Sequence, residues 1–82
     1  MPTRGDYAQI FGARLRELRT AAGLTQRELA KRAGTSSAAI SNFEAGNNAP
    51  TLGMLVRLAD ALMCNLSDLI AVLDCVARTT HK

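Results

Sequence analysis

The stretch LTQRELAKRAG, residues 24–34, constrains the fold more than any other part of this sequence. Thr25 stands where a helix N-cap would stand, and Glu28 follows three residues later, which is the spacing of a capping box. Gly34 then supplies a residue that tolerates the left-handed backbone found at helix ends. These signals predict a short helix over residues 26–33 with both of its ends fixed.

Four more helices are predicted from apolar residues that recur at spacings of three and four. The first runs to about residue 22, the third covers residues 37–45 behind Ser36, the fourth is capped by Thr51, and the fifth is capped by Asn65 together with Asp68. The residues expected to face the core in these helices are Tyr7, Phe11, Leu15, Leu18, Ile40, Phe43, Leu52, Leu55, Leu58, Leu62, Leu69, Ile70, Leu73 and Val76. The segment GNNAP is expected to be a loop, and no segment reads as a strand.

Composition fits one small domain with an aliphatic core, because 48% of the residues are hydrophobic and only 4% are aromatic. We expect a single all-α domain over residues 1–82, with its core over about residues 7–78 and short flexible tails that include ARTTHK. No apolar run is long enough for a signal peptide or a membrane span, so a cytoplasmic protein is expected. Cys64 and Cys75 are too few for a disulfide framework. We interpret Cys64 as a small core residue and leave Cys75 unassigned.

Positive charge is concentrated in the first part of the chain. Residues 1–48 carry seven basic and four acidic side chains, whereas residues 49–82 carry three of each. A basic surface of this kind suits a polyanion, although an ordinary solvated surface gives the same totals. Charge alone therefore leaves both interpretations open.

The predicted third helix has unusual outward positions. Its sequence, within GTSSAAISNFEAG, offers only Ser, Ala and Asn to the outside, where a surface helix normally carries Glu, Lys and Arg. The few residues around Gly34 that join it to the preceding helix suit a helix-turn-helix. Ala30 is small enough for a close crossing of the two helices, and Ile40 and Phe43 would attach the unit to the core. We infer that the outward face of this helix lies against a partner in use.

The stretch LTQRELAKRAGTSSAAISNFEAGNNAPTLGMLVRLADAL closely resembles the Cro/C1-type helix-turn-helix family, over about Phe11 to Ile70. The resemblance implies a compact five-helix, lambda-repressor-like DNA-binding domain. It further implies a transcriptional regulator that acts as a homodimer on a two-fold operator and controls its own promoter, as a restriction-modification controller or a phage-type repressor. The implied partner is double-stranded DNA, read in its major groove.

Positions that the family uses for DNA can be carried over to this chain. Residues at positions facing the major groove are Ser37, Ala38, Ser41 and Asn42, with Asn42 suited to adenine and Ala38 to a thymine methyl group. Residues expected at phosphates are Gln26, Arg16, Arg27, Arg32, Asn47 and Asn48. For each of these side chains, plain solvation is the alternative.

Two further groups of residues carry structural expectations. Arg19 and Glu44 resemble a partly buried ion pair that ties the first helix to the third, which we interpret as a scaffold contact rather than a DNA contact. Met63 occupies a position where the family often has Gly. An apolar patch of Met54, Met63, Val72 and Val76 is interpreted as a dimer interface, the alternative being that these residues complete the core.

An enzyme is not expected from this sequence. Its single histidine, His81, lies in the tail without a partner for general base or metal chemistry, and no phosphate-binding glycine loop is present. No metal and no cofactor is expected. The other class of function that stays open is a protein-interaction module, because some members of the family resemble toxin-neutralising antitoxins or transcriptional bridging factors.

Overall fold

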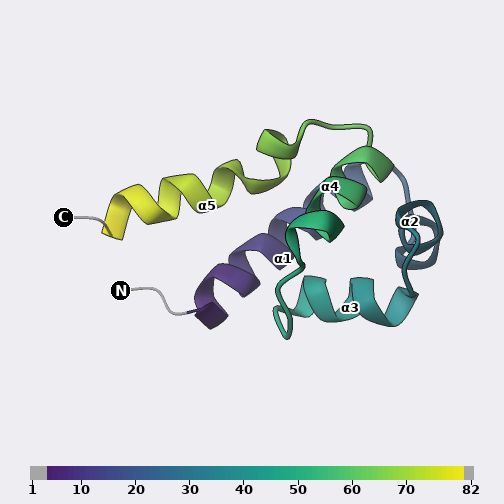
Figure 1. The fold of residues 1–82 in the computed structure, drawn as a ribbon, viewed down its shortest axis with the longest axis horizontal. Helices are drawn as coiled ribbons and strands as arrows, with labels where there is room; N and C mark the ends of the chain where they lie inside the picture. The colour runs from purple at the N-terminus through teal and green to yellow at the C-terminus, as the bar shows by residue number, and fades with distance from the viewer. Residues whose placement is uncertain (1–3, 81–82) are drawn as a thin grey trace.

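Five α-helices make up the part of the chain that the computed structural model describes, which is the backbone of residues 4–80 and the side chains of residues 7–73 (Figure 1). The helices are α1 (Arg4–Ala21), α2 (Gln26–Ala33), α3 (Ser37–Ala45), α4 (Leu52–Ala61) and α5 (Leu66–Thr80). The expected all-α architecture is confirmed, and α2 and α3 have the predicted bounds. None of the described helices is long and apolar enough to cross a membrane.

Local hydrogen bonds set the ends of α2 and α3. The Thr25 hydroxyl accepts from the Glu28 N–H at 3.1 Å, and the Glu28 carboxylate accepts from the Thr25 N–H at 2.9 Å. The pKa of Glu28 is lowered by its hydrogen bonds with Thr25. The bond from the Thr25 backbone N–H has the largest effect, and the bond with the Thr25 side chain has the next largest. Gly34 ends α2 with a φ of 72°, and the Ser36 hydroxyl begins α3 by accepting from the Ala39 N–H at 3.1 Å. Each cap satisfies backbone groups that a helix end leaves unpaired.

The starts of α4 and α5 are capped by opposite halves of a capping box. The Thr51 hydroxyl accepts from the Met54 N–H at 3.2 Å, and the Asp68 carboxylate accepts from the Asn65 N–H at 3.2 Å. Cys64, in the turn between the two helices, packs against the core, and burial raises the pKa of its thiol. Cys64 thereby attaches the turn to the core.

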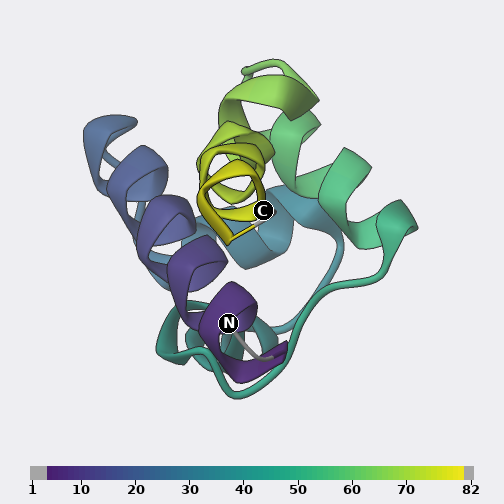
Figure 2. The ribbon, with the colours of Figure 1, turned by 90° about the vertical axis from the view of Figure 1, so that its left-hand side faces the viewer.

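One fully buried aliphatic side chain comes from every helix. These five residues have essentially no solvent exposure and are Leu15, Leu29, Ile40, Leu58 and Leu69. Full burial of such a side chain stabilises a fold by about 1.5–3 kcal/mol. The helices therefore share a single core, with α5 running beside α1 and α3 lying along the edge that is lowest in Figure 1 (Figures 1 and 2).

α1 and α3 come into backbone contact at Gly12. A Cβ atom at this position would lie 2.3 Å from the Phe43 carbonyl oxygen and 2.7 Å from that of Glu44. Gly46, which ends α3 with a φ of 79°, lies equally close to α1, because a Cβ atom there would be 2.9 Å from the Cα atom of Gln9. A side chain at either glycine would push the helices apart. The two glycines therefore fix how closely α3 packs on α1.

Arg19 joins three segments through its guanidinium group. Its Nε and Nη2 atoms donate to the Glu44 carboxylate at 2.6 and 3.1 Å, and its Nη1 atom donates to the Leu24 carbonyl at 2.7 Å. The side chains of Arg19 and Glu44 are only 11% and 5% exposed. The hydrogen bond with Glu44 raises the pKa of Arg19 above its usual value. The pair thus links α1, the turn before α2 and the last turn of α3.

In the turn after α4, Met63 adopts a left-handed backbone conformation that is unfavourable for a residue with a side chain. Met63 has a φ of 57°, and it is the one residue other than glycine with a positive φ in the described part of the chain. The N–H groups of Met63 and Cys64 donate to the carbonyls of Asp60 and Ala59, both at 3.0 Å, as in a Schellman motif. Glycine suits this position because a side chain is strained there. The Met63 side chain is 87% exposed and gains little packing in return.

Three expectations from the sequence differ from the structure. Leu52 is 72% exposed instead of buried, because the Thr51 cap makes it the first residue of α4 and turns it away from the face that buries Leu58. α1 begins at Arg4, within the N-terminal segment that was expected to be a tail before residue 7. α5 continues to Thr80, into the segment expected to be a frayed tail, since no glycine or proline follows residue 53 to end it. Residues 81 and 82 of that tail lie outside the described residues.

Substitution of Glu44 by alanine tests the weight of the ion pair with Arg19. We expect Glu44→Ala to lower the free energy of unfolding by up to about 3–5 kcal/mol, because it leaves a partly buried guanidinium without its carboxylate. Glu17, 67% exposed and paired with Arg14, is the matched control. Glu17→Ala should cost no more than about 1 kcal/mol. Urea denaturation measures both values, and equal small losses would contradict this assignment.

Substitution of Met63 by glycine tests the strained turn. Met63→Gly should raise the free energy of unfolding by about 0.5–1 kcal/mol, because relief of about 1–2 kcal/mol of left-handed strain exceeds the added entropy of the unfolded chain. Met63→Ala removes the same exposed side chain and keeps the strain, so the stability of the monomer, measured at protein concentrations below dimerisation, should stay near that of the parent. A gain of equal size in both variants, measured by urea denaturation, would show that the side chain and not the backbone is the cause.

Candidate nucleic-acid interface

α2, the turn at Gly34 and α3 form one rigid unit. The Thr35 N–H donates to the Ala30 carbonyl at 2.9 Å, which closes the turn directly after α2. Ala30 itself is 2% exposed and belongs to the same core as Ile40 of α3. A larger side chain at Ala30 would separate the two helices. The arrangement is that of a helix-turn-helix, whose second helix is free to enter a groove of DNA.

The outward side of α3 carries only small side chains. Ile40 and Phe43 are buried, whereas Ser37, Ala38 and Ser41 are exposed. Because no long side chain stands on this face, the backbone of α3 can approach a surface closely. The major groove of B-DNA, about 12 Å wide, admits an α-helix in this way.

Ala45 is a residue that sequence reasoning did not assign to this face. It is exposed, and it follows Ser41 by four residues and Ala38 by seven, so it continues the same stripe toward the end of α3. The helical spacing could have revealed it. The chain also turns away at the next residue, Gly46, so Ala45 marks the end of the face.

Asn42 lies at the border of the outward face and is half-buried. Its side-chain oxygen accepts from the Asn47 side-chain nitrogen at 3.3 Å, and its carbonyl accepts from the Asn47 N–H at 3.0 Å. The amide of Asn42 is thus oriented by the loop that follows α3. A carbonyl oxygen accepts two hydrogen bonds, so Asn42 keeps acceptor capacity for a base edge.

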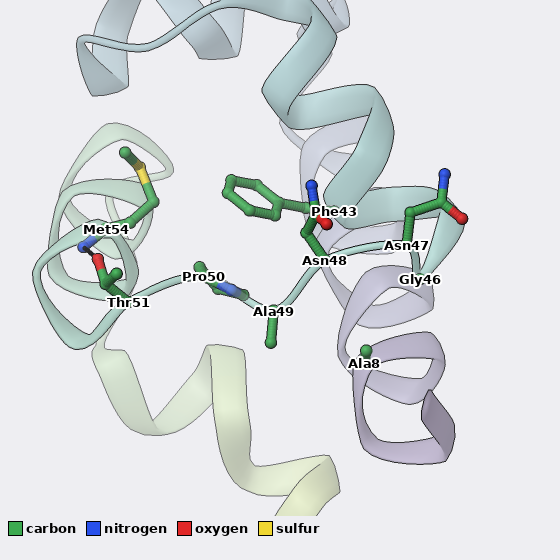
Figure 3. A pocket seen from close by; sticks show the side chains of 9 residues that line it. All are labelled: Ala8, Phe43, Gly46, Asn47, Asn48, Ala49, Pro50, Thr51 and Met54. Carbon is green, nitrogen blue, oxygen red and sulfur yellow. Dashed lines mark hydrogen bonds between the residues drawn. The ribbon is translucent and has the colours of Figure 1, made fainter. Parts of the chain in front are cut away.

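The loop between α3 and α4 crosses an open cavity of about 630 Å³ (Figure 3). Phe43 and Met54 approach each other from opposite sides of this cavity, and Pro50 lies on the loop between them (Figure 3). Asn47 and Asn48 are exposed. The loop therefore offers two amide side chains next to the end of α3.

The N-terminus of α2 begins with Gln26. The side chain of this residue is half-buried, and its Nε2 atom donates to the Glu44 Oε1 atom at 3.1 Å. The N–H groups of the first helical turn and the helix dipole favour an anion at this end. Gln26 therefore stands at a point where a phosphate group would be stabilised.

Three arginines surround the helix-turn-helix. Arg16 is exposed on α1, one helical turn from both Gly12 and Arg19, through which α1 contacts α3. Arg27 is exposed in the first turn of α2, beside Gln26. Arg32 is exposed in the last turn of α2, where its charge helps to lower the pKa of Glu28. All three side chains are thus accessible to a phosphate group.

The residues expected at a dimer interface lie in different environments. Met54 packs against the core, Val72 is half-buried, Met63 is 87% exposed, and the side chain of Val76 lies outside the described residues. Two exposed side chains that the sequence analysis did not assign to this surface are Leu52 and Val56 of α4, at 72% and 53% exposure.

Comparison with known proteins supports this arrangement. Residues 10–72 match the family of helix-turn-helix domains. The chain is 35% identical over 69 residues to y4dJ, an uncharacterized HTH-type transcriptional regulator of Sinorhizobium fredii, and the match covers 84% of this chain and 90% of that protein.

Solved structures show the same fold. The restriction-modification controller protein C.AhdI from Aeromonas hydrophila is 39% identical, with a TM-score of 0.74 over 76% of this chain and 94% of that one. The P22 c2 repressor protein, solved in complex with a synthetic operator, is 34% identical, with a TM-score of 0.69 over 74% and 92% of the two chains. The chain therefore belongs to the Cro/C1-type helix-turn-helix family of transcriptional regulators.

Proposed function

We propose that this protein is a sequence-specific DNA-binding transcriptional regulator that inserts α3 into the major groove of its operator. The observation that carries the proposal is the outward face of α3, where Ser37, Ala38 and Ser41 are exposed and no charged side chain stands. The operator-bound P22 c2 repressor, to which this chain is similar, adds support. Such a regulator acts in the cytoplasm.

Base recognition in this proposal depends on few contacts. Asn42 hydrogen-bonds adenine, Ser37 and Ser41 each make one hydrogen bond, and Ala38 contacts a thymine methyl group. No arginine on α3 is available for guanine. Discrimination between bases is therefore moderate, and the deformability of the DNA supplies part of the specificity.

Phosphate contacts place the recognition helix. Gln26 and the first turn of α2 bind one phosphate, Asn47 and Asn48 bind another, and the exposed arginines contribute charge. The residues in this group are Gln26, Arg16, Arg27, Arg32, Asn47 and Asn48. Each phosphate that is neutralised adds about −0.9 to the slope of log affinity against log salt.

A second copy of the chain is the partner that we propose for the exposed side of α4. Leu52 and Val56 of α4 and Met63 of the turn that follows are exposed apolar residues, and a Cβ atom at Gly53 would meet only the Thr51 hydroxyl oxygen, at 4.0 Å. Glycine in a helix costs about 0.5–1 kcal/mol relative to alanine, and close approach of a second backbone gives it a use. The proposed dimer interface, called the α4 seam below, thus retains Met63 from the interface expected from the sequence. It adds Leu52 and Val56 of α4.

Charge on α4 favours a copy of the same chain over another partner. Arg57 and Asp60 are both exposed and have opposite charges. In a two-fold dimer, Arg57 of one copy would face Asp60 of the other, and the same pair would form a second time by symmetry, as in any isologous interface. A homodimer places two α3 helices about 34 Å apart, one turn of DNA, and so reads a two-fold operator.

Autoregulation completes the proposal. The similarity to a restriction-modification controller and to a phage repressor supports a small regulator that acts on its own promoter. Its concentration then sets its effect, because dimerisation and operator binding both follow mass action.

Binding to DNA tests the proposal directly. We expect the protein to prefer a duplex from its own upstream region over a shuffled duplex by about 10³-fold, as specific sites exceed non-specific ones by at least that factor. Asn42→Ala should remove about 1–3 kcal/mol of this preference, the value of a bidentate base contact. Asn65→Ala, at an exposed asparagine before α5, is the control.

Fluorescence anisotropy over a salt series measures both quantities. Equal binding to the two duplexes with equal salt slopes would overturn the proposal. The class of function left would then be a protein-interaction module, such as an antitoxin.

Assembly in solution tests the α4 seam. We expect sedimentation velocity to show a dimer and Val56→Glu to shift it to monomer, because the substitution buries a charge at the seam. Ala21→Glu places the same charge at an exposed position at the end of α1 and should leave the dimer intact. A dimer that survives Val56→Glu would show that copies meet through another surface.

A further inference from the structure

The Glu44 carboxylate holds two side chains at once. Its Oε1 atom accepts from the Gln26 Nε2 atom and from the Arg19 Nη2 atom, both at 3.1 Å, while its Oε2 atom accepts from the Arg19 Nε atom at 2.6 Å. Gln26 is the first residue of α2, and Glu44 lies in the last turn of α3. A series of hydrogen bonds therefore leads from Arg19 through Glu44 to Gln26, which lies at the proposed phosphate site.

This contact determines which way the Gln26 amide faces. An ionised carboxylate only accepts hydrogen bonds, so the NH₂ group and not the oxygen of Gln26 must be turned toward Glu44. The NH₂ group has a second hydrogen, which stays available to another acceptor. Fixing a glutamine side chain costs conformational entropy, up to about 1.5–2 kcal/mol. Because Glu44 holds Gln26 in the free protein, this entropy is lost on folding and not on DNA binding.

Arg19 compensates the negative charge of Glu44 next to the proposed phosphate site. A bare negative charge beside a phosphate would repel DNA, since like charges repel more strongly in a partly buried site than in bulk water. The bidentate guanidinium neutralises Glu44 and leaves its Oε1 atom oriented toward Gln26. The third bond of Arg19, to the Leu24 carbonyl at 2.7 Å, also fixes the chain just before α2.

We propose that Glu44, held by Arg19, is a positioning residue that presents the Gln26 side chain to the DNA phosphate. The inference rests on the proposed function, because it assigns a role in phosphate binding. It differs from a purely scaffolding role of the ion pair, in which loss of the pair would weaken DNA binding equally whether or not Gln26 is present.

A double-mutant cycle on DNA affinity separates the two roles. Arg19→Lys keeps a positive charge beside Glu44 but loses the planar fork that orients the carboxylate. We expect this substitution to weaken operator binding by about threefold or more in the parent chain, with most of that loss absent in the Gln26→Ala background, because coupled residues are not additive. Circular dichroism selects a temperature at which all four proteins are folded.

The amide signals of the free protein give a second readout that needs no DNA. Gln9 and Gln26 are the two glutamines of the chain, and Gln9 is exposed. Gln26→Ala therefore assigns the Gln26 side-chain NH₂ resonances by their disappearance. We expect the hydrogens of this group to exchange with water more slowly than those of Gln9, and Arg19→Lys to shift the Gln26 signals while leaving those of Gln9 in place.

The outcomes distinguish this inference from the proposed function. Equal effects of Arg19→Lys in both backgrounds, with specific DNA binding intact, would overturn the positioning role alone. Gln26 signals that exchange as fast as those of Gln9 would overturn it as well. Failure of the parent protein to prefer its operator would overturn the proposed function and this inference with it.

Discussion

The partly buried ion pair between Arg19 and Glu44 is the interaction on which the rest of the structure depends. Its bidentate geometry and its burial make it strong in hydrogen bonding and expensive to break from one side. Together with the backbone contact at Gly12, it holds α3 against α1 at a fixed angle and depth. The same guanidinium also binds the carbonyl of Leu24. The position of the helix-turn-helix is therefore set by two residues of α1, Gly12 and Arg19, acting together.

A fixed frame allows the outward face of α3 to do without stabilising side chains. Every helix contributes one fully buried aliphatic residue to the core, and the caps of α3, at Ser36 and Gly46, satisfy its ends. Salt bridges or long side chains on the outer face are thus not needed to hold the helix. Ser, Ala and Asn remain there, which leaves the helix backbone close to the surface. The frame therefore permits a face without charged side chains, which the proposed insertion of α3 into the major groove requires.

Local signals made α2 and α3 predictable to the residue, because Thr25, Glu28 and Gly34 act on their own neighbours. The outward direction of α3 followed from helical spacing. Long-range features were not accessible in this way. The bond between Gln26 and Glu44 joins residues 18 positions apart, and the exposure of Leu52 depends on how α4 is rotated against the core. For the strained φ of Met63, the one signal in the sequence was that the family often has glycine at this position. The positive φ itself becomes visible only in the structure of the turn.

A titration with the operator duplex, followed by backbone amide chemical shifts, would test most directly that α3 is the surface that meets DNA. The structure leads us to expect the largest changes along the outer side of α3 and at the first turn of α2, with α5 nearly unaffected. Changes that instead gather on α4 and spare α3 would contradict the account, because the face of small residues would then have no part in binding.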